Sequence, residues 1–319
     1  MHRSADFLTK IAVKAWLVGI LLLMPALAMS REFPQGSVSE DSGQAVRTQE
    51  CNPASKANSS IQAGTKKHNP YRAWRRMADR EEASEPDWLS PLATTSGRIK
   101  DELRYDMWSQ TTPAGTTIST FGGGKGLEFI AAPHVQLLLG VPSYTGHSAL
   151  TPPDGFGDLP LMLKFRLASG NRSNGDYLVT LLLSATVPTA SRPNGIGAAV
   201  LTPTLAMGKG WRGFDVQTTF GANLPGSDTQ RLGRQLLWNT TFQYRAGWKL
   251  WPELEANSTF FEDGPSAGEN QTFLTPGLGF GRVRIVRGLR FAMAGGLQIA
   301  VTRFHTYNHR WMLSVRFPF

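Results

Sequence analysis

Ionisable side chains recur at even spacing along several stretches of this chain. Asp158, Lys164 and Arg166 are one such group, and Glu253 and Glu255 are another. Even spacing along an extended strand places side chains on one face. These groups could neutralise one another as ion pairs, or their charges could orient a solute. The candidates, each opposite an apolar face, are Glu128, Asp158, Lys164, Arg166, Asp215, Gln217, Gln243, Arg245, Glu253, Glu255, Arg290, Gln298 and Arg316.

Hydrolytic chemistry is the alternative use of such residues. His147 adjoins Ser148, but no G-x-S-x-G element accompanies them, and the nearby acids qualify only by being acidic. The histidines lack the spacing of metal ligands, and the glycine-rich stretch 122–126 lacks the full spacing of a phosphate loop. It is better explained as a kink in a curved strand. We therefore expect no enzyme, no metal and no cofactor.

The elements that position the polar faces show period-two alternation from about Thr95 onward. In the stretch 288–302, Leu289, Phe291 and Met293 share one face, while Arg290 and Ala292 share the other. This pattern predicts twelve strands, at 95–110, 118–131, 135–144, 156–169, 176–187, 198–209, 213–223, 235–247, 250–261, 271–285, 288–302 and 308–319.

The connections between these strands alternate between short turns and longer polar loops. Strands of about ten residues, joined in this way, are typical of barrels that span a bacterial outer membrane. A soluble sandwich or lipocalin-like barrel would use the same alternation with its apolar face inward. Strand length and aromatic residues near strand ends favour contact with outer-membrane lipid. The fold class predicted for 94–319 is therefore an all-β, antiparallel transmembrane barrel.

Both ends of the chain carry export features. Residues 1–28 have basic residues, an apolar stretch and a small-residue cleavage site at Ala26–Leu27–Ala28, which predicts a signal peptide rather than a membrane anchor. The last strand places Trp311, Phe317 and Phe319 on one face. An alternating strand that ends on Phe resembles the signal by which the barrel-assembly machinery recognises its clients.

The segment 29–93 is rich in polar residues and has few aliphatic ones, so we expect most of it to be disordered. Residues 71–83 could form a short helix or a solvated linker with transient helicity. Cys51 is the single cysteine, which excludes an intramolecular disulfide. The net charge of +9 comes from scattered basic residues, so we expect no nucleic-acid partner.

Several segments of 91–319 resemble a known family. PLATTSGRIKDELRYD at 91–106, FGGGKGLEFI at 121–130, GVPSY at 140–144 and GFGDLPLMLKFRL at 155–167 are similar to outer-membrane proteins grouped under the meta-pathway of phenol degradation. The resemblance implies a barrel associated with the transport of aromatic or other hydrophobic compounds. It implies no catalytic residues.

These observations together predict an outer-membrane channel or transporter that admits small hydrophobic or aromatic solutes by passive diffusion. The alternatives are a structural or adhesive barrel without transport, and an outer-membrane hydrolase. The sequence leaves open whether the lumen is free or is blocked by residues 31–93.

Overall fold

The computed structural model describes residues 69–319, except 124, 151, 191–192, 248 and 287. The predicted signal peptide 1–28, Cys51 and residues 29–68 of the segment predicted to be disordered lie outside the described residues.

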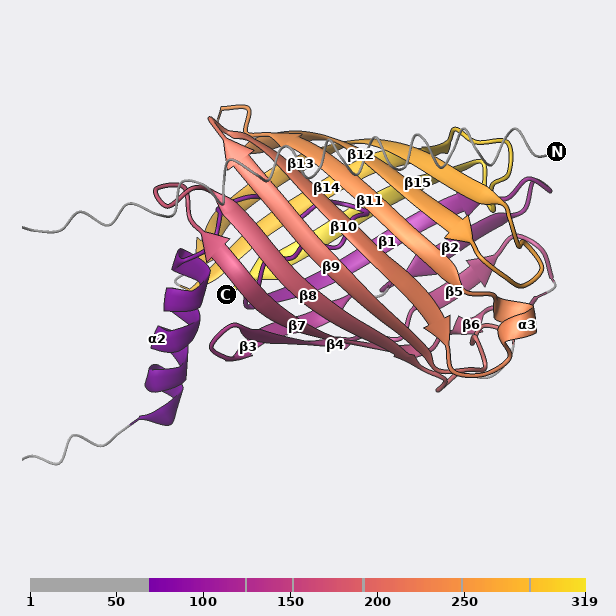
Figure 1. Cartoon of the computed structure of the whole chain (residues 1–319), viewed down its shortest axis with the longest axis horizontal. Coiled ribbons are helices and arrows are strands. Elements are labelled where there is room, and N and C mark those ends of the chain that lie inside the picture. The colour runs from indigo at the N-terminus through magenta and orange to yellow at the C-terminus, as the bar shows by residue number, and fades with distance from the viewer. Residues whose placement is uncertain (1–68, 124, 151, 191–192, 248, 287) are drawn as a thin grey trace, which may run out of the picture. The chain divides into compact units, whose positions relative to one another are not determined.

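The described chain forms one antiparallel sheet that closes on itself, because β15 pairs with β1 (Figure 1). Three pairs of short strands, β2 with β3, β4 with β5 and β6 with β7, each make up one interrupted strand, so the wall consists of twelve. The strands are β1 (Glu102–Thr111), β2 (Thr117–Phe121), β3 (Gly126–Ala132), β4 (Val135–Gly140), β5 (Tyr144–His147), β6 (Gly155–Phe156), β7 (Leu159–Gly170), β8 (Tyr177–Val187), β9 (Val200–Trp211), β10 (Phe214–Pro225), β11 (Gln235–Tyr244), β12 (Leu250–Phe261), β13 (Asn270–Val286), β14 (Leu289–Ala300) and β15 (His309–Pro318).

The predicted fold class and strand number are confirmed. One predicted strand is wrong at its start, because 95–101 are not part of the wall and β1 begins at Glu102. The partner strand explains this: Pro318 pairs with Glu102, and the amide of Phe319 donates to the carbonyl oxygen of Asp101. No paired strand remains beyond that point for residues 95–101.

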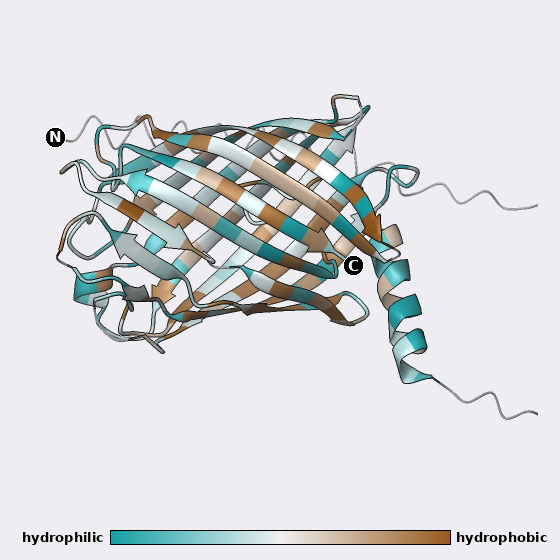
Figure 2. Ribbon diagram, turned by 180° about the vertical axis from the view of Figure 1, so that it is seen from behind, coloured by the Kyte–Doolittle hydropathy of each residue, from teal (hydrophilic) through white to brown (hydrophobic). Residues whose placement is uncertain are grey.

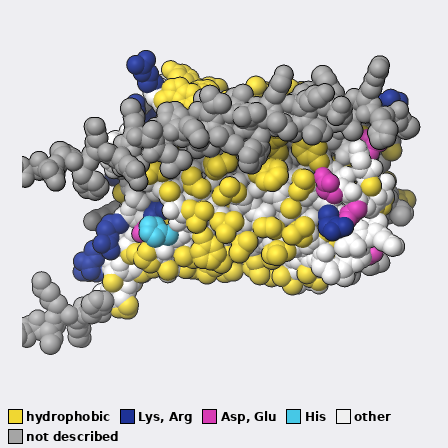
Figure 3. Space-filling view, viewed as in Figure 1, with side chains coloured by type: hydrophobic (Ala, Val, Ile, Leu, Met, Phe, Trp, Pro, Cys, Tyr) yellow, Lys and Arg dark blue, Asp and Glu magenta, His cyan; other side chains and the backbone are white. Residues whose placement is uncertain are grey.

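Apolar side chains cover the outside of the barrel. Leu254 on β12 and Leu278 on β13 are each about half exposed, whereas Glu255 and Thr275, an odd number of residues away on the same strands, are fully buried. Figure 2 shows this alternation along the strands, and Figure 3 shows the hydrophobic side chains spread over one face of the wall. An apolar outer face around a polar interior is the construction of a barrel that spans a bacterial outer membrane.

The connections define the two ends of the barrel. Short turns lie at the end that holds the start of β1 and the end of β15, such as Arg212–Gly213, whose positive φ angles fit a tight hairpin turn. Longer connections lie at the opposite end, and one of them contains the short helix α3 (Thr229–Leu232). The short-turn end is periplasmic and the long-loop end is external.

A helix, α2 (Pro70–Ala83), lies at the periplasmic end (Figure 1). It begins where the side chain of Asn69 accepts a hydrogen bond from the amide of Arg72, with Pro70 in the first turn. The Trp74 indole donates to the carbonyl oxygen of Ile130 at 2.7 Å, which fixes the helix to β3. Of the two alternatives for 71–83, a short helix and a solvated linker, the structure has the helix.

Among the described residues, no helix combines the length and apolar character needed to cross a membrane.

The wall is interrupted on neighbouring strands. Residues 122–125, 141–143 and 157–158 separate β2 from β3, β4 from β5 and β6 from β7. Gly122 has a φ of +84°, which favours glycine, so the glycine-rich stretch 122–126 does break the strand in which it was predicted. The second and third interruptions change which side chains face inward, since Tyr144 and Phe156 are exposed although they lie an even number of residues from the buried Gln136 and Lys164.

A charge on the outer face tests the membrane assignment. Leu254→Arg should lower the free energy of unfolding in phospholipid vesicles by about 2–4 kcal/mol, because it places a guanidinium against lipid near the middle of β12. Urea titration followed by tryptophan fluorescence measures the change. Leu150→Arg is the control, since Leu150 is 99% exposed in an external connection and should tolerate the charge. Equal effects of the two variants would contradict the assignment.

Candidate functional site in the barrel lumen

Residues 84–101, here called the lumen segment, connect α2 to β1 and have no helix or strand. Most of the segment is buried, including Trp88, Leu89, Leu92 and Ile99. It contacts wall strands all around the barrel, and it reaches Asn257, which donates to the Thr94 hydroxyl at 3.1 Å. The segment therefore fills the periplasmic part of the lumen.

Apolar side chains of the lumen segment pack where the wall has no bulky side chains. Leu89 lies against Gly279 on β13 and forms a buried cluster with Trp251 and Ala292. Trp88 lies against Gly208 on β9. A side chain at either glycine would overlap these residues, so the glycines allow the close approach of the segment.

Glu255 on β12 binds the middle of the lumen segment. Its Oε1 accepts hydrogen bonds from the amides of Leu92 and Ala93 at 2.8 Å each, and its Oε2 accepts from the amide of Thr94 at 2.6 Å. Glu255 is fully buried. The carboxylate thus takes the place of the carbonyl groups that a helix or sheet would supply to these amides.

Cationic and amide side chains of the wall bind carbonyl groups in the first half of the lumen segment, residues 84–94. Arg316 on β15 donates to the carbonyl oxygens of Ser90 and Pro91, and Arg104 on β1 donates to that of Leu92. Gln217 Nε2 lies 3.3 Å from the carbonyl oxygen of Leu89. Wall side chains therefore satisfy both the donors and the acceptors of an irregular backbone.

The second half of the lumen segment, residues 95–101, is bound in the same way. Lys164 donates to the carbonyl oxygen of Arg98 at 3.0 Å, and Gln136 accepts from the amide of Lys100 at 2.7 Å. Glu85 accepts from the amide of Ile99 with both carboxylate oxygens at 3.1 Å.

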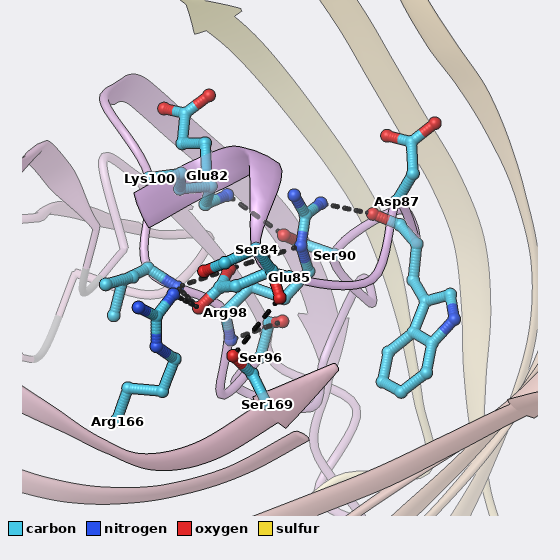
Figure 4. A network of polar contacts seen from close by, with 12 residues as sticks. Glu82, Ser84, Glu85, Asp87, Ser90, Ser96, Arg98, Lys100, Arg166 and Ser169 are labelled. Atoms are coloured by element: carbon cyan, nitrogen blue, oxygen red, sulfur yellow. Dashed lines mark hydrogen bonds and ion pairs between the residues drawn. The ribbon is translucent and has the colours of Figure 1, made fainter. Parts of the chain in front are cut away.

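An ionic cluster lies next to the wall, near the two ends of the lumen segment (Figure 4). Glu85 lies 3.2 Å from Arg166 of β7 and 3.7 Å from Arg98 in the second half of the lumen segment. Burial raises the pKa of Glu85 to about 7, although both arginines favour its charged form. Burial also acts to raise the pKa of Asp87, but Arg282 and Arg98 outweigh it, and the pKa lies below its usual range.

A cavity of about 560 Å³ opens at the periplasmic mouth beside this cluster. Its lining joins the start of the lumen segment to the turn between β7 and β8, and consists of Glu82, Ala83, Glu85, Asp87, Arg98, Asn171, Arg172 and Ser173.

Ten of the thirteen side chains predicted for the polar faces are buried. Nine of them contact the lumen segment or one another, as in the pair of Lys164 with Glu128 at 3.3 Å and the bond from Gln243 to Glu253 at 2.6 Å, and Gln298 bonds to Asn257 and Tyr307. These ten are Glu128, Lys164, Arg166, Asp215, Gln217, Gln243, Glu253, Glu255, Gln298 and Arg316.

The other three lie elsewhere. Asp158 does not join Lys164 and Arg166, because the break between β6 and β7 removes the regular alternation; it accepts instead from the amides of Ala190 and Ile196 in an external connection. Arg245 and Arg290 are exposed at the periplasmic ends of their strands. Arg245 Nη1 lies 3.6 Å from Asp87.

The residues of the predicted assembly signal lie on or next to β15. Trp311 is exposed on the outer face, and the ring of Phe317 lies 5.7 Å from that of Phe291. Phe319 makes the backbone bond to Asp101 that ends the pairing of β1 with β15. Their recognition by the barrel-assembly machinery stays a prediction.

A second group of lumen residues lies at the external mouth. The Arg310 guanidinium of β15 is 4.0 Å from the ring centre of Tyr307 and 5.2 Å from that of Trp108. Tyr307 stacks on Phe273 of β13 at 4.2 Å. Arg310 is not among the thirteen residues predicted for the polar faces, although its even spacing from Arg316 places it on the same face.

The described residues around His147 do not form the Ser-His-Asp triad that the hydrolase alternative needs. His147 Nδ1 lies 3.5 Å from Asp154, but the Ser148 hydroxyl accepts a hydrogen bond from the amide of Thr117. The described part of the chain also contains no group of three or more His, Cys, Asp or Glu side chains that could hold a metal.

The fold resembles solved outer-membrane barrels at low sequence identity. The COG4313 outer membrane channel from Pseudomonas putida F1 is 13% identical, with a TM-score of 0.49 over 73% of this chain and 100% of that one. NanC porin is 7% identical, with a TM-score of 0.45 over 69% and 98%. Outer membrane phospholipase A from Escherichia coli is 14% identical, with a TM-score of 0.37 over 76% and 97%. No family model and no curated protein matches the chain. Resemblance at this level assigns neither a family nor an activity.

Removal of the Glu255 carboxylate should release the middle of the lumen segment. Glu255→Ala leaves three amides without their acceptor, and a hydrogen bond to a charged group contributes about 1.5–3 kcal/mol. Amide exchange at Leu92–Thr94, measured by mass spectrometry, should therefore accelerate at least about tenfold. The control is Glu262→Ala, an exposed acid in an external connection, which should leave that exchange unchanged. Unchanged exchange in Glu255→Ala would contradict the assigned contact.

Docking of the lumen segment should also depend on pH. The docked Glu85, with its pKa near 7, holds a proton that a released, hydrated Glu85 with a pKa of 4.5 has lost. Docking is therefore most favourable below about pH 4.5 and weakens as pH rises to about 7, by a few kcal/mol in total. Protection of the Ile99 amide, corrected for intrinsic exchange, should fall over this range. Glu85→Gln should remove the dependence; an equal slope in that variant would assign it to another group.

Proposed function

We propose that this barrel is an outer-membrane channel whose lumen is closed by the lumen segment and opens when the segment moves. The observation that carries this proposal is the way the segment is bound. Side chains such as Glu255 and Arg316 bind its backbone, and it shares no strand pairing with the wall. The segment can therefore leave while the closed ladder of the barrel stays intact.

For the solute, we propose small hydrophobic or aromatic compounds that cross by passive diffusion. The external mouth supports this class, because the rings of Trp108, Tyr307 and Phe273 gather there. Grouping of the chain with proteins of the meta-pathway of phenol degradation is part of the same proposal. It rests on the motifs of 91–167 and includes no hydrolytic activity.

A structural barrel without transport is the second candidate. It is favoured by the filling of the periplasmic part of the lumen, where Leu89 packs with Trp251 and Ala292. The two candidates differ in one measurable property, which is permeability to small solutes.

Permeability of liposomes that contain the full-length mature protein distinguishes them. Uptake of phenolsulfonate, a small aromatic whose charge keeps it from crossing lipid quickly, should exceed that of protein-free liposomes within the first seconds after mixing. Glu255→Ala should raise the protein-dependent rate several-fold, because it loosens the segment that closes the lumen. Glu262→Ala should behave like the unmodified protein. No protein-dependent uptake in either the unmodified protein or Glu255→Ala would overturn the channel in favour of the structural barrel.

A further inference from the structure

Arg310 lies at the external mouth of the barrel, on the inner face of β15. It pairs across the ladder with Gln110 of β1, next to the external end of each strand. Its Nε and Nη2 both donate to Gln110 Oε1, at 2.9 and 2.6 Å. Its guanidinium carbon lies over the rings of Tyr307 and Trp108, 4.0 and 5.2 Å from their centres. These contacts fix the guanidinium at the point where the lumen opens to the outside.

Lumen cations differ in their partners: Arg316 is bound by the carbonyl oxygens of Ser90 and Pro91, whereas others have an acid. Lys164 pairs with Glu128 at 3.3 Å, and Arg104 pairs with Asp106 at 2.8 Å. Among the described residues, no carboxylate oxygen lies within 4 Å of the Arg310 guanidinium, and none accepts a hydrogen bond from its Nη1. Nη1 donates to no group of the described residues and can be reached by solvent.

We propose that Arg310 forms a binding site for the carboxylate of a small organic acid with an apolar body. A guanidinium presents several N–H groups in one plane, which suits the two oxygens of a carboxylate. Tyr307 and Trp108 hold it in place, so little side-chain entropy is lost on binding. The inference deepens the proposed channel function and rests on it, since it makes anionic solutes the preferred ones at the entrance.

The neighbouring aromatic rings select the rest of the solute. Phe273 and Tyr307 offer apolar surface beside a charge that lacks an acid, and Tyr307 is held by its hydroxyl, which donates to Gln298. A solute with a carboxylate alone gains only the ionic contact. A neutral solute of the same shape gains only the apolar one. The site should therefore bind best an anion that also carries an apolar group.

Calorimetric titration of the full-length mature protein in detergent micelles tests the site with three probes. Benzoate should bind, whereas benzamide, its neutral analogue, and acetate, which lacks the apolar group, should each bind at least about tenfold more weakly. Arg310→Gln should weaken benzoate binding about tenfold, as expected for the loss of one charge-assisted contact. Arg231→Gln is the matched control: Arg231 is an exposed external arginine already paired with Asp228, and its loss should leave benzoate binding unchanged.

Three results would overturn the inference: equal binding of benzoate and benzamide by the unmodified protein, unchanged binding in Arg310→Gln, or an equal loss in Arg231→Gln. The first comparison needs no variant, so it stands even if Arg310→Gln fails to assemble. Failure of the channel itself is distinguishable. Liposome uptake without Arg310-dependent binding removes this site and keeps the channel, whereas binding without uptake keeps the site and removes the channel.

Discussion

Satisfaction of an irregular backbone inside a closed barrel is the constraint on which the rest of the structure depends. The lumen segment brings unpaired amides and carbonyl groups into a place where the sheet has no free edge to bind them. Glu255 supplies the acceptor for three successive amides, and Arg316 and Arg104 supply donors to the carbonyl groups beside them. The charges on the inner wall are therefore fixed by the chain that they hold as well as by one another.

This arrangement explains the composition of the inner wall. Cations such as Lys164 make two kinds of contact, one with the backbone of the lumen segment and one with an acid of the wall. Where the lumen segment packs closely, the uncharged residues of the inner wall are small or apolar, as at Gly279. Leu178 and Leu182 of β8 are also buried on the inner face. A lumen lined only by polar groups would offer no such contacts. The wall is thus fitted to one segment of its own chain.

Much of the wall could be predicted from the sequence, because alternation and loop length depend on neighbours close in the chain. β12 was predicted with the bounds that the structure has, and the even spacing of Glu253 and Glu255 placed both on the buried face. The lumen segment could not be predicted in this way. Trp88, Leu92 and Ile99 show no periodicity, since an irregular segment buries side chains in all directions, and its partners are distant in sequence. Asp158 shows the same limit, because the break after β6 interrupts the alternation.

The small inward residues of β13 and β14 have a consequence for the barrel in its open state. Gly279 and Ala292 expose backbone and methyl groups once Leu89 is withdrawn, whereas Arg316, Arg104 and Lys164 lose the carbonyl groups to which they donate. Because Ala292 pairs across the ladder with Arg316, the apolar strip and the freed N–H groups of that guanidinium would lie side by side in the emptied passage. A solute with an apolar body and a hydrogen-bond acceptor at one end would contact both at once, and would pass this part of the wall in a preferred orientation.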